Sequence, residues 1–251
     1  MSSLAEIHLL DHKIRLYQPQ QGFRTSLDSV LLAAACPAVK SQKVLDIGCG
    51  VGGASFCLLY REAELQLTGI DIQEEYIHIA NQNRGLNNRN EKTLFKIESV
   101  EDFRIENPQD RFDHVICNPP FYDAGDHIPS PYMAIALARG HIDEALTLRD
   151  WIDCAFYNLK SRGSFTIIHQ AEKLDVILRD MGKRFGATEI IPIYTKLGRP
   201  AKRVIIRSYK DRQTPLILRQ AVYLEDASGR QTEEAHFLLR EGYSFDNLYQ
   251  K

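Results

Sequence analysis

The fold is decided by the stretch KVLDIGCGVGG, residues 43–53. It begins as a short apolar run around a single carboxylate, Asp46, and it ends in four glycines. Such a run is typical of a strand that is buried on both faces of a parallel sheet. The glycines permit a tight turn, so we expect this strand to pass directly into a helix.

The same rhythm continues on both sides of this stretch. Predicted strands cover 43–48, 65–72, 92–99, 111–120 and 161–170, and predicted helices cover 27–39, 52–63, 74–87, 148–160 and 171–185. Two last strands, 190–196 and 202–210, are too close for a helical crossover and should form an antiparallel hairpin. We therefore predict a Rossmann-like α/β fold, with a seven-stranded, mostly parallel sheet, a terminal antiparallel hairpin and helices on both faces.

The length of 251 residues suits one large α/β domain. We expect a single domain over 1–251, with an N-terminal extension (1–27), a catalytic core (28–212) and a C-terminal appendage (213–251). The formal net charge of −2 excludes a uniformly basic nucleic-acid coat protein. It leaves room for a local basic patch.

The chain contains no long apolar run, and its start, MSSLAEIHLLDHKIRLYQ, is charged throughout, so we expect no membrane span and no export signal. The five cysteines are scattered without CxxC spacing. They favour buried or free thiols in a reducing compartment, the cytoplasm.

The glycine loop points to a nucleotide-like ligand. Gly48, Gly50 and Gly53 match the pattern G-x-G-x-x-G, and Asp71 follows about 20 residues later, where it suits a ribose. A dinucleotide fits this pattern, but Asp46 favours S-adenosylmethionine, because a carboxylate attracts its cationic amino-acid moiety and gains nothing from a pyrophosphate. Simpler explanations are that the glycines only permit the turn and that Asp46 only caps the next helix.

The fourth predicted strand ends in Asn118-Pro119-Pro120-Phe121, beside the glycine loop. The prolines remove two backbone donors, which leaves an amide oxygen and backbone carbonyls to accept hydrogen bonds from a planar –NH2 group. These bonds favour a pyramidal nitrogen with its lone pair toward a methyl donor, while Phe121 stacks on the flat substrate. The simpler alternative is that Pro-Pro only ends the strand.

These motifs resemble the amino-group methyltransferases with an (Asn/Asp/Ser)-Pro-Pro-(Tyr/Phe) motif, within the class I methyltransferases. The chain is most similar to the bacterial tRNA adenine-N6 methyltransferases that modify the purine 3′ of the anticodon in a valine tRNA. Further matching segments are GFRTSLDSVLLAAA (22–35), LGRPAKRVIIRSYK (197–210), LEDASGRQTEEA (224–235) and LLREG (238–242). The resemblance implies S-adenosylmethionine as cofactor, S-adenosylhomocysteine as product and a tRNA adenine as substrate.

The resemblance also implies which residues form the site. The catalytic residues are Asn118, Pro119, Pro120 and Phe121. The cofactor-binding residues are Asp46, Gly48, Cys49, Gly50, Asp71, Ile72, Ser99, Val100 and Asn118. Ser99 stands where related enzymes commonly have an Asp, so Glu101 or Asp102 is an alternative there. Phe121 stands where many adenine enzymes have Tyr, and Phe also occurs in rRNA guanine-N2 methyltransferases.

A basic segment, KLGRPAKRVIIRSYKDR (196–212), carries a charge of +6 in 17 residues. We expect Arg199, Lys202 and Arg203 there, together with Arg24, to contact RNA phosphates. The alternative is a solvated edge hairpin whose charges block aggregation.

Three further possibilities remain open from the sequence. The loop 123–141 is either a substrate lid or a variable surface connection. Its histidines, His127 and His141, lack spaced partners, so we expect no metal site.

The alternative enzymes are a protein glutamine methyltransferase, an rRNA guanine-N2 methyltransferase and an NAD oxidoreductase. An RNA-binding protein without activity is the remaining alternative, and the intact Asn-Pro-Pro-Phe speaks against it.

Overall fold

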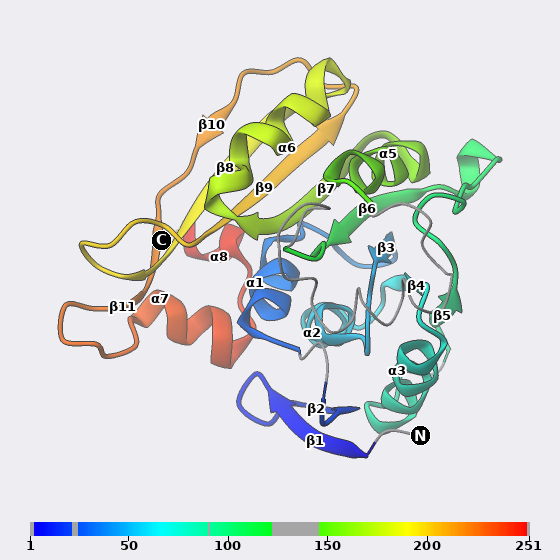
Figure 1. The fold of residues 1–251 in the computed structure, drawn as a ribbon, viewed down its shortest axis with the longest axis horizontal. Coiled ribbons are helices and arrows are strands. Elements are labelled where there is room, and N and C mark those ends of the chain that lie inside the picture. Colours follow the sequence, from blue (N-terminus) through cyan, green and yellow to red (C-terminus); the bar gives the residue numbers. More distant parts are fainter. Residues whose placement is uncertain (1–2, 22–24, 90, 122–145, 250–251) are drawn as a thin grey trace.

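The computed structural model describes residues 3–21, 25–89, 91–121 and 146–249. Its centre is a run of parallel strands in the order β7-β6-β3-β4-β5 (Figure 1). Their bounds are β3 Lys43–Ile47, β4 Gln66–Asp71, β5 Thr93–Ile97, β6 Phe112–Cys117 and β7 Leu159–Gln170. The predicted parallel strands are thus confirmed, and β3, the strand of the opening stretch, lies in the middle of them.

The sheet is completed by an antiparallel hairpin. Strand β9 (Arg203–Lys210) lies between β7 and β8 (Phe185–Lys196) and runs antiparallel to both. The hairpin was predicted, but the prediction of seven strands is wrong. Two short strands from the C-terminal segment, β10 (Ile217–Leu218) and β11 (Val222–Glu225), pair in parallel with β8 and make a nine-stranded sheet, because β8 offers them an unpaired edge.

Helices cover both faces of this sheet, as predicted (Figure 1). One face carries α1 (Leu27–Ala35), α2 (Gly53–Arg61) and α3 (Glu74–Leu86), and the other carries α5 (Leu148–Asn158) and α6 (Leu174–Met181). Helix α1 ends earlier than predicted because Cys36 precedes Pro37 and is extended. Gly182, with a φ of +53°, ends α6 early, and short 3-10 turns (Ala171–Lys173 and Gly182–Arg184) flank the helix.

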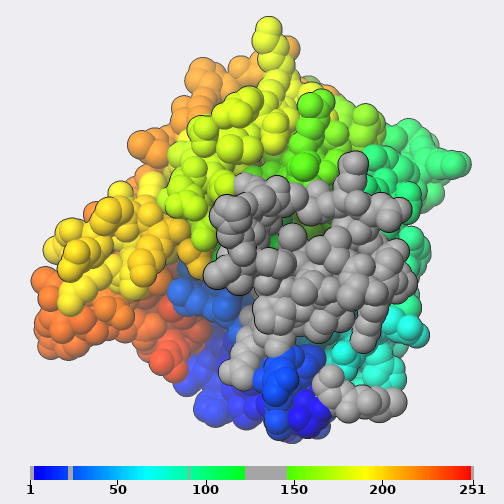
Figure 2. Space-filling view, in the orientation of Figure 1, coloured from blue at the N-terminus to red at the C-terminus, as the bar shows by residue number. Residues whose placement is uncertain are grey.

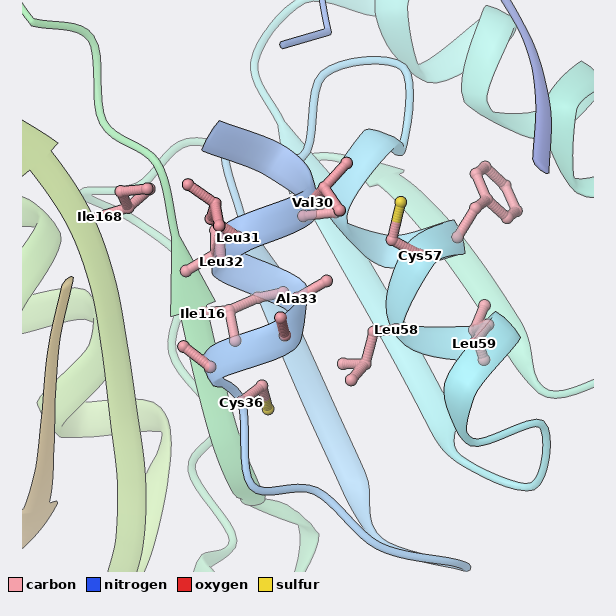
Figure 3. Close-up of a cluster of buried hydrophobic side chains, with 14 of the residues drawn as sticks. Val30, Leu31, Leu32, Ala33, Cys36, Cys57, Leu58, Leu59, Ile116 and Ile168 are labelled. Atoms are coloured by element: carbon pink, nitrogen blue, oxygen red, sulfur yellow. The ribbon is translucent and has the colours of Figure 1, made fainter. Parts of the chain in front are cut away.

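The strands alternate their side chains between two hydrophobic layers. On β6, Ile116 packs toward α1 and α2, whereas Val115 packs toward α5. Figure 3 shows the first layer, in which Leu31 and Leu32 of α1 point toward the strands, whereas Leu58 of α2 lies on the other side of α1. The central strands are buried on both faces, which explains why they read as continuous apolar runs rather than as alternating ones.

The N-terminal residues form a hairpin that we did not predict. Strands β1 (Leu4–Leu9) and β2 (Ile14–Pro19) pair with each other and pack against α3. The Asn83 side chain of α3 accepts a hydrogen bond from the backbone N–H of Tyr17 and donates to the Tyr17 carbonyl, at 2.7 and 2.9 Å. The hairpin therefore depends on a helix that lies far along the chain.

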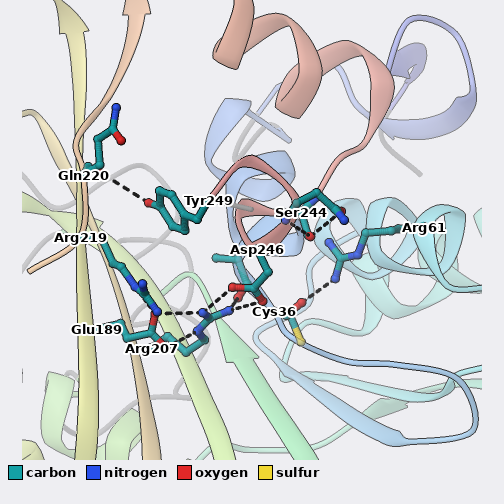
Figure 4. Close-up of polar contacts among 11 residues, drawn as sticks. Cys36, Arg61, Glu189, Arg207, Arg219, Gln220, Ser244, Asp246 and Tyr249 are labelled. Atoms are coloured by element: carbon teal, nitrogen blue, oxygen red, sulfur yellow. Dashed lines mark hydrogen bonds and ion pairs between the residues drawn. The ribbon is translucent and has the colours of Figure 1, made fainter. Parts of the chain in front are cut away.

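The C-terminal segment returns to the core. Helix α7 (Glu233–His236), a π-helical turn (Phe237–Glu241) and α8 (Phe245–Tyr249) bury Leu238 and Phe245 completely. Arg207 of β9 holds α8 in place, because its guanidinium contacts Asp246 at 2.7 Å and Glu189 of β8 at 3.0 Å (Figure 4).

One further element lies in the middle of the chain, where a short 3-10 turn, Pro108–Asp110, precedes β6.

Candidate active site

The glycine loop joins β3 to α2 by a sharp reversal of the backbone. Gly48, Gly50 and Gly52 have φ angles of +66°, +54° and +92°, a region that L side chains rarely adopt. A Cβ on Gly48 would lie 2.6 Å from the Trp151 ring of α5, whereas a Cβ on Gly50 would meet no atom of the described residues within 4 Å. Gly48 is thus required by the packing of the protein itself, and Gly50 opens onto free space.

Asp71, at the end of β4, fixes this loop through hydrogen bonds to backbone N–H groups. Its two carboxylate oxygens accept hydrogen bonds from the backbone N–H groups of Gly50 and Gln73, both at 2.9 Å. Burial raises the pKa of Asp71, and the two backbone hydrogen bonds oppose that shift. Asp71 therefore fixes the position of Gly50 in addition to any contact it makes with a ligand.

Asp46 lies inside the cleft and is almost fully buried. Burial raises its pKa to about 7, the nearby Asp71 charge adds to the rise, and the hydrogen bond from Ser55 lowers it. That hydrogen bond joins Ser55 Oγ of α2 to Asp46 Oδ2 at 2.6 Å. A buried carboxylate without a cation nearby is costly, so a positively charged ligand group in this cleft would be stabilised by Asp46.

Asn118 follows β6 and lies at the same cleft. Its side-chain oxygen is buried and accepts no hydrogen bond from the described part of the chain. A buried acceptor without a partner is rare in folded proteins. This atom is therefore available to a donor that enters from outside, as an amino group would.

The residues after Asn118 continue along the sheet edge. Pro119 is buried and Pro120 is exposed. The half-buried Phe121 ring is approached by two side chains: the Arg203 guanidinium carbon lies 4.5 Å from its centroid, and the His169 ring packs perpendicular to it at 5.1 Å. Phe121 thus lies near the ends of β7 and β9 as well as at the end of β6.

The predicted cofactor residues fall into three groups. Five of them line one cleft: Asp46, Gly48, Cys49, Gly50 and Asn118. Asp71 lies beneath the loop, and Ile72, just beyond it, is exposed. After β5, Ser99 Oγ accepts a hydrogen bond from the Glu101 N–H, and Val100 is buried. The binding roles of all nine stay predictions.

The cleft has further walls beyond the predicted binding residues. They are Thr25, Ser29, Leu32, Val51, Gly53, Ala54 and Tyr76. Val51, Gly53 and Ala54 continue the glycine loop, but Ser29 and Leu32 come from α1, and Tyr76 comes from α3. The segment 22–35, which resembles a family motif, was the signal for the α1 wall.

The geometry fits S-adenosylmethionine. Open space above Gly50 admits a ligand close to the backbone, Asp46 offers a carboxylate to a cationic group, and the Asn118 oxygen awaits a donor. When bound there, this group supplies an electrophilic methyl carried by a sulfonium. The cleft and the acceptor loop are adjacent because they follow the neighbouring strands β3 and β6.

The basic segment contains both exposed and inward-facing cations. Arg199 and Lys202 are exposed in the β8–β9 turn, which protrudes in yellow beside the orange C-terminal segment in Figure 2. Arg203 is turned inward, with Nε 3.1 Å from Asp28 Oδ2. The segment is therefore not a charged surface along its whole length, because Arg207 and Lys210 are buried.

Some predictions lie outside the described residues: the contact of Arg24, the role of loop 123–141 and the two histidines within it. All five cysteines are buried and unpaired, as predicted. Across the ranges that the structure describes, no group of three His, Cys, Asp or Glu side chains is arranged to hold a metal, and no helix is long and apolar enough to cross a membrane.

Comparisons with known proteins agree with this geometry. The chain is 28% identical over 181 residues to a tRNA1(Val) (adenine(37)-N6)-methyltransferase of Shewanella woodyi, which covers 71% of this chain and 70% of that protein. It is 25% identical over 228 residues to the enzyme of the same name in Shewanella baltica, covering 88% and 92% of the two chains.

Solved structures share the fold. A predicted O-methyltransferase from Agrobacterium tumefaciens superposes with a TM-score of 0.69 at 21% identity, over 87% of this chain and 97% of that one. A 16S rRNA N2 methyltransferase from T. thermophilus superposes with a TM-score of 0.56 at 16% identity, over 83% and 50%. The family model described as methyltransferase small domain matches residues 24–193. That match spans well over half of the sequence, so the chain belongs to the methyltransferase small domain family and is an S-adenosylmethionine-dependent methyltransferase.

Proposed function

We propose that this enzyme methylates N6 of an adenine in tRNA, next to the anticodon. The observation that carries the proposal is the buried, unpartnered Asn118 oxygen at the cleft that Asp46 and Gly50 line. It is an acceptor aimed at an incoming amino group. The similarity to relatives named tRNA1(Val) (adenine(37)-N6)-methyltransferase supports the choice of substrate.

Asn118 accepts a hydrogen bond from the exocyclic amine and so weakens the conjugation of its lone pair with the ring. The Pro119 carbonyl accepts the second amine proton. Phe121 stacks on the base and sets its angle to the cleft. Positioning and electrostatics suffice as catalysis, since the nitrogen loses its extra proton to solvent after the transfer and no strong base is needed.

The target adenine must be unpaired, because a stacked and paired amine cannot enter this loop. An anticodon loop offers such a base. Within this proposal, Arg199 and Lys202 contact tRNA phosphates, together with Arg24. The chain acts as one domain in which 1–27 and 213–251 flank the core 28–212. A tRNA substrate and five buried thiols suit an enzyme of the cytoplasm.

The experiment is methyl transfer from labelled S-adenosylmethionine to total tRNA, total rRNA and protein, followed by nucleoside analysis. We expect label in tRNA, recovered as N6-methyladenosine. Label in rRNA as N2-methylguanosine, or in protein as methylglutamine, would replace the proposal with the corresponding alternative. The variant Asn118→Ala is the control for labelling that does not depend on this loop.

A further inference from the structure

We propose that Arg203 is a positioning residue for the acceptor base, which acts by holding the ring of Phe121, and that Asp28 holds Arg203 in turn. The inference rests on the proposed function only in needing a planar amine-bearing acceptor beside Phe121. It changes the expected role of Arg203, which the charge pattern of the hairpin assigned to an RNA phosphate.

The Arg203 side chain is engaged on several sides. Its Nε donates to Asp28 Oδ2 at 3.1 Å, its Nη1 donates to the Lys202 carbonyl at 3.2 Å, and its guanidinium covers the Phe121 ring at 4.5 Å. The side chain is 29% exposed, whereas Arg199 and Lys202 are exposed residues. A planar guanidinium can pair with a carboxylate and stack on an aromatic face at the same time.

Asp28 is a firm anchor for this arrangement. It is buried, and it lies in the first turn of α1, where the helix dipole stabilises a negative charge. The Ser26 side chain caps that turn by accepting a hydrogen bond from the Asp28 N–H. Ser29 and Leu32 of the same helix line the cofactor cleft. Asp28 and Arg203 therefore join the wall of the cleft to the acceptor loop.

This connection matters because methyl transfer depends on alignment. A misplacement of about 1 Å at the reacting centre can lower a rate by about 100-fold. Phe121 follows two prolines and its ring is only half-buried, so contacts with neighbouring side chains help to fix its orientation. The guanidinium covers one face of the ring and the His169 ring packs nearly perpendicular to it, and both contacts restrict the orientation of Phe121.

The test compares Arg203→Ala, Arg203→Lys and Asp28→Asn in single-turnover methyl transfer, with the affinities for tRNA and S-adenosylmethionine measured separately. We expect Arg203→Ala to lower the transfer rate constant by roughly 10- to 100-fold while both affinities stay within about two-fold. Asp28→Asn should act in the same direction, and Arg203→Lys should recover only part of the rate. Because the two residues act together, the double variant Asp28→Asn/Arg203→Ala should be little worse than Arg203→Ala alone.

Arg184 provides a matched control on the other face of the sheet. It pairs with Asp153 at 2.6 Å and covers the Phe156 ring at 5.2 Å, the same pair of contacts. We expect Arg184→Ala to change stability and to leave the transfer rate constant unaltered. An equal rate loss in both alanine variants would overturn the inference, because the loss would then reflect general destabilisation.

The salt dependence separates positioning from phosphate binding. If Arg203→Ala keeps its transfer rate at saturating tRNA but lowers the slope of log affinity against log salt by about one, Arg203 is a phosphate contact and the inference is wrong. If the wild-type enzyme methylates rRNA or protein instead of tRNA, the proposed function fails. The same variants are then measured on that substrate, where an unchanged transfer rate would overturn the role of Arg203.

Discussion

Strand β9 carries basic residues along its length, and those at its start have different partners from those farther along. Arg203, at the start, contacts Asp28 and the ring of Phe121 beside the cleft. Arg207, four residues later, is 3% exposed and links Glu189 to Asp246. Lys210, at the end, donates to the carbonyls of Phe156 and Leu159. The start of the strand lies beside the cleft, and the remainder holds the C-terminal segment and α5 against the sheet.

The difference shows what a charge count can conceal. The segment 196–212 has a charge of +6 in the sequence, but its buried cations are committed to internal partners. Near the site, the exposed cations of the β8–β9 turn remain accessible to an external anion. Substitutions can therefore distinguish the cations that stabilise the protein from the cations that are open to a ligand. The same distinction can be tested at the glycines of the loop.

The largest effect is expected from Arg207→Met. Removing this guanidinium takes the cation away from Asp246 and leaves Glu189 with Arg219 alone, so we expect a loss of about 3 kcal/mol, the lower end of the range for breaking a buried ion pair. Urea unfolding measures the loss. The control Lys202→Met, on an exposed side chain of the same hairpin, should change the free energy of unfolding by less than about 0.5 kcal/mol. Equal losses in the two variants would show that burial does not distinguish them.

Two glycines of the loop should also separate stability from binding. Gly48→Ala places a Cβ 2.6 Å from Trp151 at a positive φ, and we expect it to lower the free energy of unfolding by about 1–3 kcal/mol. The new methyl group of Gly50→Ala meets no atom of the described residues, so its cost is mainly the backbone strain of about 1–2 kcal/mol. Its new methyl group points into open space where we place the cofactor. For the same loss of stability, Gly50→Ala should therefore lose more affinity for S-adenosylmethionine than Gly48→Ala does. Calorimetry measures both quantities.

Asp46 should make cofactor binding depend on pH. Its pKa of about 7 means that the carboxyl group is protonated below neutrality, and only the ionised form attracts a cation. We expect the affinity for S-adenosylmethionine to fall by up to roughly ten-fold for each pH unit below that pKa. In calorimetry between pH 5.5 and 7, Asp46→Asn should bind weakly and without this dependence. An identical pH dependence in both proteins would assign the titration to another group.

The same raised pKa sets the sign of a stability change. The folded state holds the Asp46 proton more tightly than the unfolded chain, whose carboxyl group titrates near 3.8. Its contribution to stability is therefore fully present below about pH 4 and is lost as the pH rises toward 7. Wild-type protein should lose stability relative to Asp46→Asn across this interval, and a constant difference between the two would contradict the assigned pKa.

The smallest effect belongs to the exposed cations of the β8–β9 turn. Arg199→Ala and Lys202→Ala should each weaken tRNA binding modestly and reduce the salt slope by about one for every phosphate that the variant no longer neutralises. Filter binding at several salt concentrations measures the slope. Unchanged slopes in both variants would show that this turn does not contact tRNA phosphates.

The sequence predicted the local features well and the long-range ones poorly. The strand before Gly48, the helices behind it and the β8–β9 hairpin follow from apolar periodicity and short connections. The hairpin β1–β2 was missed because it is held by Asn83, more than 60 residues away. Helix α8 was missed for a similar reason, since its anchor is Asp246 on Arg207.

The site shows the same limit. Asp46, Gly50 and Asn118 could be found from motifs, because each lies in a strand of the central sheet or shortly after one. Tyr76 carries no local signal, and it lines the cleft only because α3 folds back beside the glycine loop. The inward turn of Arg203 depends on Asp28, which is 175 residues away in the sequence. Partners that meet only in the folded chain decide whether a cation is a ligand contact or a structural one.

The most direct measurement is single-turnover methyl transfer by Asn118→Ala with bound cofactor and unmodified tRNA. We predict that the rate constant falls by at least about 100-fold, since the buried acceptor for the amine is removed, while cofactor affinity changes by less than about ten-fold. A transfer rate within a few-fold of the wild-type value would contradict the claim that the amino group is held and activated at Asn118.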